Sequence, residues 1–290
     1  MTVRSRARRV LTSLAIVAGV LLGTAATGAA DPATPTPDGW RWDAPGWGYQ
    51  ATQDGQWYTS PQGQYHVNDR GGYLAPSPHR TWGGGTGVLG YPTAPLREER
   101  VPHGVGLGRY QTFERGVIYD GANGIWGTRD DSAITSVHRA LGGGGGPLAY
   151  PLGNVVQDAP GWTYQRFESG TIYSSSNGTV AVPAGFDREH RAEGGGRAMG
   201  YPTRTVNVDA PGYSWQSFER GIIYCRDLCF AVTGAYRTMH DARGGGTGSL
   251  GYPISLATYD GARRTWYQQF ERGAVVRGPG GDTVVPGTYR

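Results

Sequence analysis

Lysine is absent from the 290 residues of this chain, and cysteine occurs only twice, so arginine supplies every positive side chain apart from histidine. A lone pair of cysteines does not favour a metal or redox site. Common enzyme motifs are missing as well: there is no Gly-x-Ser-x-Gly elbow, no His-Glu-x-x-His helix and no phosphate-binding glycine loop. The sequence therefore offers no recognisable catalytic motif, and we expect a non-catalytic protein with no cofactor.

Long apolar runs are also missing, and the longest belongs to a targeting signal. Four arginines between positions 4 and 9 precede an apolar run from Val10 to Leu22, which is too short to span a bilayer, and small residues follow up to Ala30. We predict a signal peptide over residues 1–30 and a secreted product with no membrane span after cleavage. The pair Arg8 and Arg9 also allows a twin-arginine signal, although the residues after it fit the ordinary secretory route better.

Net charge gives no support to a nucleic-acid partner. The formal charge of the chain is +4, which the four arginines of the signal account for, so the mature part is close to neutral. Glycine is abundant, with 50 residues, but it recurs at fixed offsets between aromatic and β-branched segments. That placement is typical of turns in a folded β protein.

Two short elements mark an internal repeat. The first is a four-residue signature, found as Leu89-Gly90-Tyr91-Pro92, Leu148-Ala149-Tyr150-Pro151, Met199-Gly200-Tyr201-Pro202 and Leu250-Gly251-Tyr252-Pro253. The second, aromatic-Gln-x-Phe-Glu-x-Gly, follows each signature and contributes Phe113, Glu114 and Gly116, then Phe167, Glu168 and Gly170, then Phe218, Glu219 and Gly221, then Phe270, Glu271 and Gly273. We interpret both elements as structural motifs. Ala149, which replaces the usual glycine, predicts an ordinary backbone conformation at that position.

A fifth unit opens the mature chain without the signature. Asp43-Ala44-Pro45-Gly46-Trp47 matches the segments 158–162 and 209–213, and Tyr49-Gln50 then aligns with Tyr164-Gln165. The sequence therefore predicts a Pro-rich linker over 31–39 and five units over about 40–88, 89–147, 148–198, 199–249 and 250–290.

Each unit reads as β structure followed by a short helix. The aromatic-Gln-x-Phe segment predicts a strand, the Glu-x-Gly a tight turn, and segments such as 117–119 and 179–182 two further strands. Helix-prone stretches at 132–141, 187–192 and 234–242 end at glycine runs. Cys225 and Cys229 fall at the two ends of the second turn, where a disulfide would pin one hairpin.

These residues resemble the LGFP repeat of cell-wall-associated actinobacterial proteins, with Tyr in place of Phe in the signature. The resemblance covers about residues 40 to 290. In that family the repeats usually sit beside a catalytic domain, such as a mycolyltransferase or an amidase, and here none accompanies them. The resemblance implies binding to cell-wall polysaccharide, and five units imply a closed, propeller-like disc with pseudo-fivefold symmetry, mainly β with short helices.

Two polar series recur once per unit. Glu114, Glu168, Glu219 and Glu271 lie in matching surroundings, which favours turn or packing roles over catalysis. His79, His138, His190 and His240 each lie four residues before a glycine run. A ring would bring these histidines around one axis as a metal or anion site, but we prefer the alternative that each caps the last turn of its own helix. We therefore predict no bound metal.

Candidate ligand-binding residues alternate along one strand of every unit: Tyr49 and Gln50, Tyr110 and Gln111, Tyr164 and Gln165, Trp215 and Gln216, Tyr267 and Gln268. The ring and the amide project to opposite faces of the strand, and either series can face the core. An aromatic face with an adjacent amide suits a sugar ring, although each aromatic can equally be a simple core residue. Asp43, Asp158 and Asp209 are expected to organise turns rather than to bind calcium.

The pattern as a whole predicts a secreted, cell-wall-associated monomer. We expect it to bind cell-wall polysaccharide, either arabinogalactan or peptidoglycan, through repeated weak sites that a polymeric ligand strengthens by avidity. Two other classes stay open: a secreted hydrolase or inhibitor with one asymmetric cleft, and a protein-binding scaffold.

Overall fold

The computed structural model describes residues 40–52, 55–61, 63–68, 79, 82–102 and 107–289; the predicted signal peptide and linker lie outside these ranges. Within them the protein is mainly β, with five four-stranded antiparallel sheets and a few short helices. Each sheet falls inside one of the five predicted units, numbered 1 to 5 below. The strands of every sheet follow chain order, so neighbouring strands are joined as hairpins.

The strands of the five sheets have the following bounds. Unit 1 contains β1 (Trp40–Ala44), β2 (Trp47–Thr52), β3 (Gly55–Ser60) and β4 (Gly63–Asn68). Unit 2 contains β5 (Arg97–Arg100), β6 (Leu107–Phe113), β7 (Gly116–Gly121) and β8 (Gly124–Arg129). Unit 3 contains β9 (Val156–Ala159), β10 (Trp162–Phe167), β11 (Gly170–Ser175) and β12 (Gly178–Pro183). Unit 4 contains β13 (Asn207–Ala210), β14 (Tyr213–Phe218), β15 (Gly221–Cys225) and β16 (Cys229–Thr233), and unit 5 contains β17 (Thr258–Asp260), β18 (Thr265–Phe270), β19 (Gly273–Gly278) and β20 (Gly281–Pro286).

Short helices follow the sheets. They are η1 (Gly84–Thr86), α2 (Ala133–Ala140), η2 (Gly143–Gly145), α3 (Ala184–Ala192), α4 (Gly195–Ala198), α5 (Gly234–Asp241) and η3 (Gly245–Thr247). The longer helices α2, α3 and α5 each end just before a left-handed glycine, at Gly142, Gly194 and Gly244. A glycine run thus ends these helices, as the sequence indicates.

The first strand of each sheet was not predicted. In units 1, 3 and 4 this strand carries the Asp-Ala-Pro-Gly turn, and its pairing with the second strand is interrupted by a β-bulge. A bulged strand of four or five residues loses the regular alternation of apolar and polar side chains by which strands are recognised. The other three strands of each unit correspond to the predicted hairpin and third strand.

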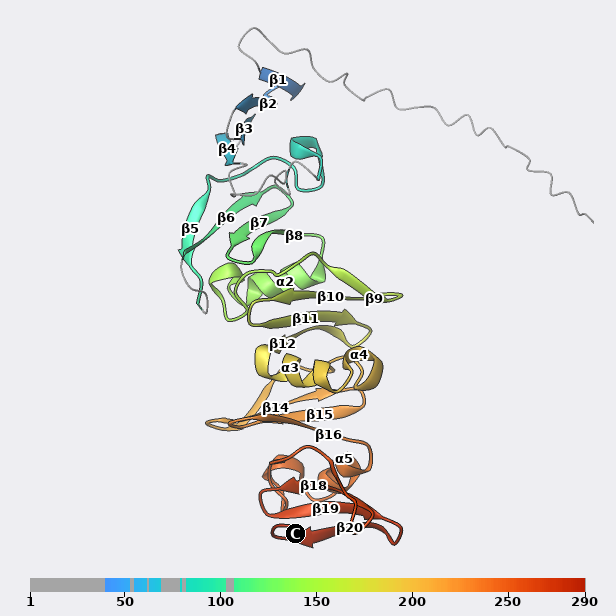
Figure 1. Ribbon diagram of the computed structural model, residues 1–290. Coiled ribbons are helices and arrows are strands. Elements are labelled where there is room, and N and C mark those ends of the chain that lie inside the picture. Colours follow the sequence, from blue (N-terminus) through green and yellow to red (C-terminus); the bar gives the residue numbers. More distant parts are fainter. Residues whose placement is uncertain are drawn as a thin grey trace, which may run out of the picture.

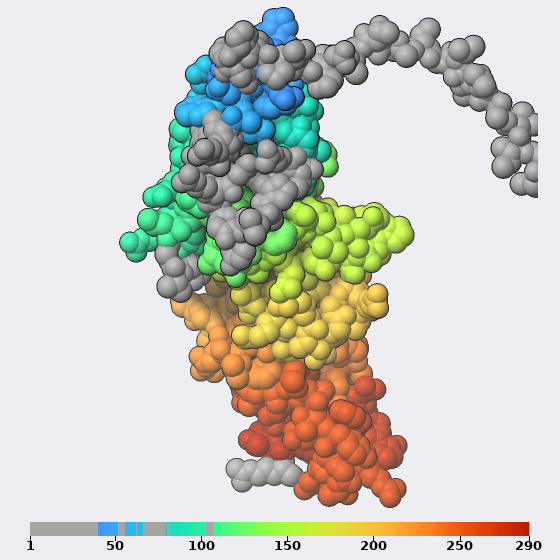
Figure 2. Space-filling model, turned by 45° about the horizontal axis from the view of Figure 1, so that its top comes forward, coloured from blue at the N-terminus to red at the C-terminus, as the bar shows by residue number. Residues whose placement is uncertain are grey.

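The five sheets form an open column, in chain order from unit 1 at one end to unit 5 at the other (Figures 1 and 2). The three longer helices pack against the following sheet: α2 contacts β11 and β12, α3 contacts β15 and β16, and α5 contacts β19, while α3 and α5 also contact their own sheets. A helix layer between successive sheets displaces each unit along one axis. The predicted closed disc with pseudo-fivefold symmetry is therefore not confirmed, and Figure 1 shows a stack in its place.

The hydrophobic core lies between units rather than inside them. One cluster joins Tyr173 and Phe186 of unit 3 to Tyr201, Phe218 and Ile223 of unit 4, all of them buried. A second cluster joins unit 4 to unit 5 in the same way. Because a four-stranded sheet cannot bury both faces alone, each unit depends on its neighbours for its core.

The predicted disulfide between Cys225 and Cys229 is present. The two residues face each other across the turn between β15 and β16, and the bridge spans a sequence separation of 4. Cys225 is buried in the cluster between units 3 and 4, where Cys229 packs at the edge. The bridge therefore fixes the end of one hairpin beside this cluster.

Candidate functional site

The histidine series holds neighbouring units together. In each case the imidazole Nε2 lies 2.8 to 2.9 Å from the carbonyl oxygen of the second residue of the next signature, and the pairs are His79 with Gly90, His138 with Ala149, His190 with Gly200 and His240 with Gly251. The same ring stacks on the phenylalanine of the next unit, with centroids 4.4 to 4.6 Å apart. We call this arrangement the junction core and name the junctions by the units they join.

The interpretation that each histidine caps its own helix is wrong in this structure. The carbonyl that each Nε2 faces belongs to the next unit, so the histidine does not cap the last turn of its own helix. Burial lowers the pKa of His138, His190 and His240, which favours a neutral ring whose Nε2–H donates to that carbonyl. Among the described residues no group of three or more His, Cys, Asp and Glu side chains could hold a metal ion.

The signature is the second part of the junction core. Its Leu or Met and its Tyr are buried at every junction, and its Pro forms an isolated bridge with the Phe of the same unit. The tyrosine hydroxyl donates to a carboxylate on the first strand of the preceding sheet: Tyr91 to Asp43, Tyr201 to Asp158, and Tyr252 to Asp209 at 2.9 Å. The three aspartates therefore connect units, in addition to lying at turns as predicted.

The glycine after Phe-Glu explains one fixed position of the repeat. A Cβ on Gly116 or Gly221 would lie 2.6 Å from the Leu89 or Met199 side chain of the signature. The absence of a side chain lets the signature pack directly on the turn.

The glutamate series has the packing role expected from the sequence. Glu114 Oε2 accepts a hydrogen bond from the Tyr91 amide at 3.1 Å, and Glu271 Oε2 accepts one from Tyr252 at 3.2 Å. The other carboxylate oxygen reaches back to the second turn of the preceding unit: Asn123 donates to Glu168, Asn177 to Glu219 and Arg226 to Glu271. These carboxylates thus link the signature to the unit before it.

The glutamine half of the candidate ligand-binding series needs correction. Gln111, Gln165, Gln216 and Gln268 are buried. Their Nε2 atoms donate to backbone carbonyls, which for Gln216 are Ala181 at 2.9 Å in the preceding unit and Arg204 at 3.0 Å in its own. Gln268 does the same with Ala231 and Ser255. Gln111 donates to Ala94 of its own unit. The four buried amides are thus engaged with the backbone and are not presented to a ligand; Gln50 is half-buried.

The aromatic half of that series lies on the other face and is half-buried at all five positions. Tyr49, Tyr110, Tyr164 and Trp215 each face a tyrosine on the next strand in register, and the ring centroids are 5.8 to 6.5 Å apart. Tyr267 packs on Tyr289 at 4.9 Å. Tyr49, Tyr110, Tyr164 and Trp215 pack against the clusters at the junctions, whereas Tyr267 packs within the last unit. All five rings are partly exposed, so both roles considered from the sequence are open to them.

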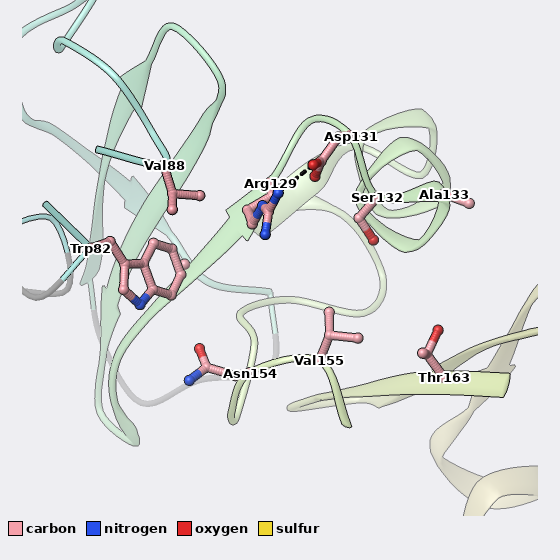
Figure 3. Close-up of a pocket in the computed structure, with 10 residues that line it drawn as sticks. Trp82, Val88, Arg129, Asp131, Ser132, Ala133, Asn154, Val155 and Thr163 are labelled. Carbon is pink, nitrogen blue, oxygen red and sulfur yellow. Dashed lines mark hydrogen bonds and ion pairs between the residues drawn. The ribbon is translucent and has the colours of Figure 1, made fainter. Parts of the chain in front are cut away.

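A pocket that the sequence did not indicate lies where units 1, 2 and 3 meet (Figure 3). Its volume is about 540 Å³. Trp82 of unit 1 lies at one end and Thr163 of β10 at the other, with Arg129, Asn154 and Val155 between them. The pocket combines one indole face with amide, hydroxyl, guanidinium and carboxylate groups. The carboxylate belongs to Asp131, which pairs with Arg129 at the edge of the pocket.

Gly127 makes room for the tryptophan. A Cβ on Gly127 would clash with the Trp82 ring, which lies directly against β8. The equivalent positions in units 3 and 4 are Ala181 and Ala231, and the positions equivalent to Trp82 are Leu141, Glu193 and Arg243. The indole pocket is therefore specific to this place in the column, and the small residue at 127 was the available sequence signal for it.

Comparisons with known proteins identify no relative that explains this site. No family model matches the chain, and no curated protein matches it. Two crystal structures share 10% identity with it, the extracellular domains of proteins described as a one-component system and a hybrid two-component system from B. thetaiotaomicron. They match over 87% of this chain but over only 31% and 36% of their own lengths, at a TM-score of 0.16, which is too low to support an argument.

No helix in the part of the chain that the structure describes is both long and apolar enough to cross a membrane.

Proposed function

We propose that this chain is a secreted, non-catalytic binding protein that attaches to cell-envelope polysaccharide, with the Trp82 pocket as its main contact. The observation that carries the proposal is the pairing of an indole face with several hydrogen-bonding side chains in one open pocket. A sugar ring presents an apolar face for stacking and hydroxyl groups around its edge, and this lining complements both.

The repeated polar residues support binding over catalysis. The histidine and glutamate series, each present in four of the five units, would supply the natural acids and bases of an enzyme. They are engaged in the junction cores. The resemblance of the repeat to the LGFP family rests on its motif residues and agrees with attachment to arabinogalactan or peptidoglycan. The Cys225–Cys229 disulfide supports an oxidising, extracellular location.

Attachment can be tested by sedimentation with purified cell walls. The mature protein, folded by circular dichroism, is expected to sediment with the walls. Trp82→Ala should weaken binding roughly tenfold, because removal of the ring deletes about 1.4 kcal/mol of stacking. Failure of the folded wild-type protein to sediment would show that the proposal is wrong.

Two further variants make the test specific to the pocket. Asn154→Ala removes a polar lining group on an exposed side chain, so it should weaken binding without affecting folding. Trp266→Ala deletes an exposed indole in unit 5, far along the column, and should bind as the wild type does. Equal sedimentation of Trp82→Ala, Asn154→Ala and wild type would remove the pocket from the proposal.

The open alternative of a hydrolase or inhibitor uses the same pocket, because it is the asymmetric cleft which that alternative requires. Arg129 and Asp131 are its charged groups, and they pair with each other. Release of reducing sugar from the sedimented walls would favour the hydrolase.

A further inference from the structure

A second cavity, of about 360 Å³, opens on the side of the column at junction 3/4. Two aromatic rings, Tyr164 and Tyr173, line it together with Arg166 on β10, Arg191 on α3 and Arg197 on α4. We call this cavity the arginine groove. It shares no lining residue with the Trp82 pocket.

The three arginines are not neutralised within the groove. Neither the Arg166 nor the Arg197 side chain makes a hydrogen bond or an ion pair with any described residue. Arg191 pairs at 3.0 Å with Asp187, whose side chain is only 4% exposed and does not line the groove. Asp158, the one acidic residue of the lining, accepts a hydrogen bond from the hydroxyl of Tyr201.

Neighbouring charges leave the groove positive. Arg220 donates to the backbone carbonyls of Gly196 at 2.9 Å and Arg197 at 2.7 Å, which fixes this wall and adds a guanidinium close by. Glu219, which lies 3.9 Å from Arg220, is engaged by Asn177. Four arginines and three carboxylates thus lie in or beside the groove. The guanidinium groups of Arg166 and Arg197 have no partner among the described residues.

Junctions 2/3 and 4/5 lack this feature although they share the same framework. At junction 4/5 the positions equivalent to Arg166, Arg191 and Arg197 are Ser217, Asp241 and Thr247. The helix ion pair is reversed as well: Asp187 and Arg191 of α3 become Arg237 and Asp241 of α5. At junction 2/3 the equivalents are Thr112, Arg139 and Gly145, and Arg139 pairs with Asp130. The positive groove of junction 3/4 is therefore absent from the junctions on either side of it.

We infer that the arginine groove binds an anionic group, a carboxylate or a phosphate, carried by an acidic polysaccharide. The guanidinium fork matches the paired oxygens of either anion, and the half-buried ring of Tyr164 gives an apolar wall for the sugar next to it. This inference rests on the proposed function and narrows its ligand to glycans that carry negative charge.

Titration calorimetry with defined polymers tests the inference. The probes are polygalacturonate for the carboxylate, poly(glycerol phosphate) for the phosphate and dextran as a neutral polymer. The wild-type protein is expected to bind at least one anionic polymer at least about tenfold more tightly than dextran. Comparison of the two anionic polymers identifies the anion. Equal affinity for dextran and both anionic polymers would overturn the inference.

The double variant Arg166→Ser with Arg197→Thr introduces the residues of junction 4/5, and it should reduce affinity for the anionic polymer about tenfold. Arg188→Ser serves as the control for the loss of one positive charge outside the site, because this exposed arginine of α3 does not line the groove. Unchanged binding by the double variant, or an equal loss in the control, would show that the groove is not the site. Wall sedimentation that persists while the polymer test fails would leave the proposed function standing and reject this inference alone.

Discussion

Junctions 3/4 and 4/5 have the same core and different rims. In both cores a tyrosine, a histidine, a second tyrosine and a phenylalanine pack together: Tyr173, His190, Tyr201 and Phe218 at one, Tyr224, His240, Tyr252 and Phe270 at the other. The ring distances differ by less than 1 Å between the two junctions. At the rim, three arginines are replaced by serine, aspartate and threonine.

The difference separates the residues that build the column from those that can bind a ligand. In the core, the histidine Nε2, the tyrosine hydroxyl and the glutamine Nε2 of each junction have partners in the protein, so a change there leaves a buried group unsatisfied. At the rim, side chains such as Arg166 and Arg197 can change without disturbing a neighbour. We therefore look for ligand specificity at the rims and for stability in the cores.

The strongest test of equal cores is to remove the histidine from each. His190→Ala and His240→Ala should each destabilise the protein by about 3 kcal/mol, because each leaves a cavity against phenylalanine and a backbone carbonyl without its donor. The loss at His190 should be slightly larger, since its Nδ1 also lies 3.3 Å from the Tyr173 hydroxyl. Urea unfolding, together with hydrogen exchange of individual amides, measures both losses.

A rim variant provides the contrast. Arg166→Ser should change the free energy of unfolding, measured in urea, by less than about 0.5 kcal/mol, because the side chain has no partner among the described residues to lose. A loss at Arg166 as large as that at His190, or losses at the two histidines that differ by more than about 2 kcal/mol, would contradict the division into core and rim.

The cores should also make stability depend on pH. Burial lowers the pKa of His138, His190 and His240 in the folded protein, whereas unfolded histidine titrates near pH 6.5. Below about pH 6.5 these histidines bind protons in the unfolded chain but stay neutral in the folded protein until the pH approaches their lowered pKa. The stabilisation is therefore complete above about pH 6.5 and declines as the pH falls toward the folded pKa values, by about 1.4 kcal/mol per unit of pKa lowering for each histidine.

Urea midpoints at about pH 7.5 and about pH 5.5 measure this effect. His240→Gln should show a smaller decline than the wild type, because glutamine does not titrate in this range. A midpoint that is constant or that rises on acidification would show that the junction histidines are not held neutral.

The sequence predicted the local parts of these junctions better than their assembly. The Phe-Glu-x-Gly turns, the hairpins and the Cys225–Cys229 bridge depend on residues close in the chain, whose geometry short motifs determine. The repeat also showed that equivalent residues make equivalent contacts. It did not determine how each unit is rotated and displaced relative to the one before it. Equivalent contacts between neighbouring units are compatible with both a closed ring and an open column.

Whether the candidate site residues are exposed depends on how neighbouring units are arranged. Alternation placed Tyr164 and Gln165 on opposite faces of β10, but whether either face is open depends on what lies above and below the sheet. In the column the Tyr164 ring stays partly exposed and lines the arginine groove, whereas Gln165 is a buried donor to Gly153 of its own unit at 2.9 Å. The Trp82 pocket combines residues of three units, and a pattern within one unit cannot reveal it.

One irregularity inside the cores offers a smaller test. Ala149 has φ of 59°, close to the 74°, 77° and 75° of Gly90, Gly200 and Gly251, so the expectation of an ordinary backbone conformation at this position was wrong. The turn of the signature requires the left-handed conformation at every junction, and there an alanine side chain costs about 1 to 2 kcal/mol.

Ala149→Gly should therefore stabilise the protein by about 1 kcal/mol, since the relieved strain exceeds the added entropy of glycine in the unfolded chain. A Cβ at this place in the turn points at the glutamate of the unit: on Gly90 it would clash with Glu114 Oε2. Glu168 Oε2 is buried without a partner beside Ala149, whereas Glu114 and Glu271 accept the signature amide. Urea unfolding should show the gain, and slower exchange of the Tyr150 amide would report a new bond to Glu168.

Gly200→Ala, the reverse change at junction 3/4, should destabilise the protein by a similar amount. A neutral result for both variants would mean that this turn tolerates a side chain and that the junction cores are less uniform than their geometry indicates.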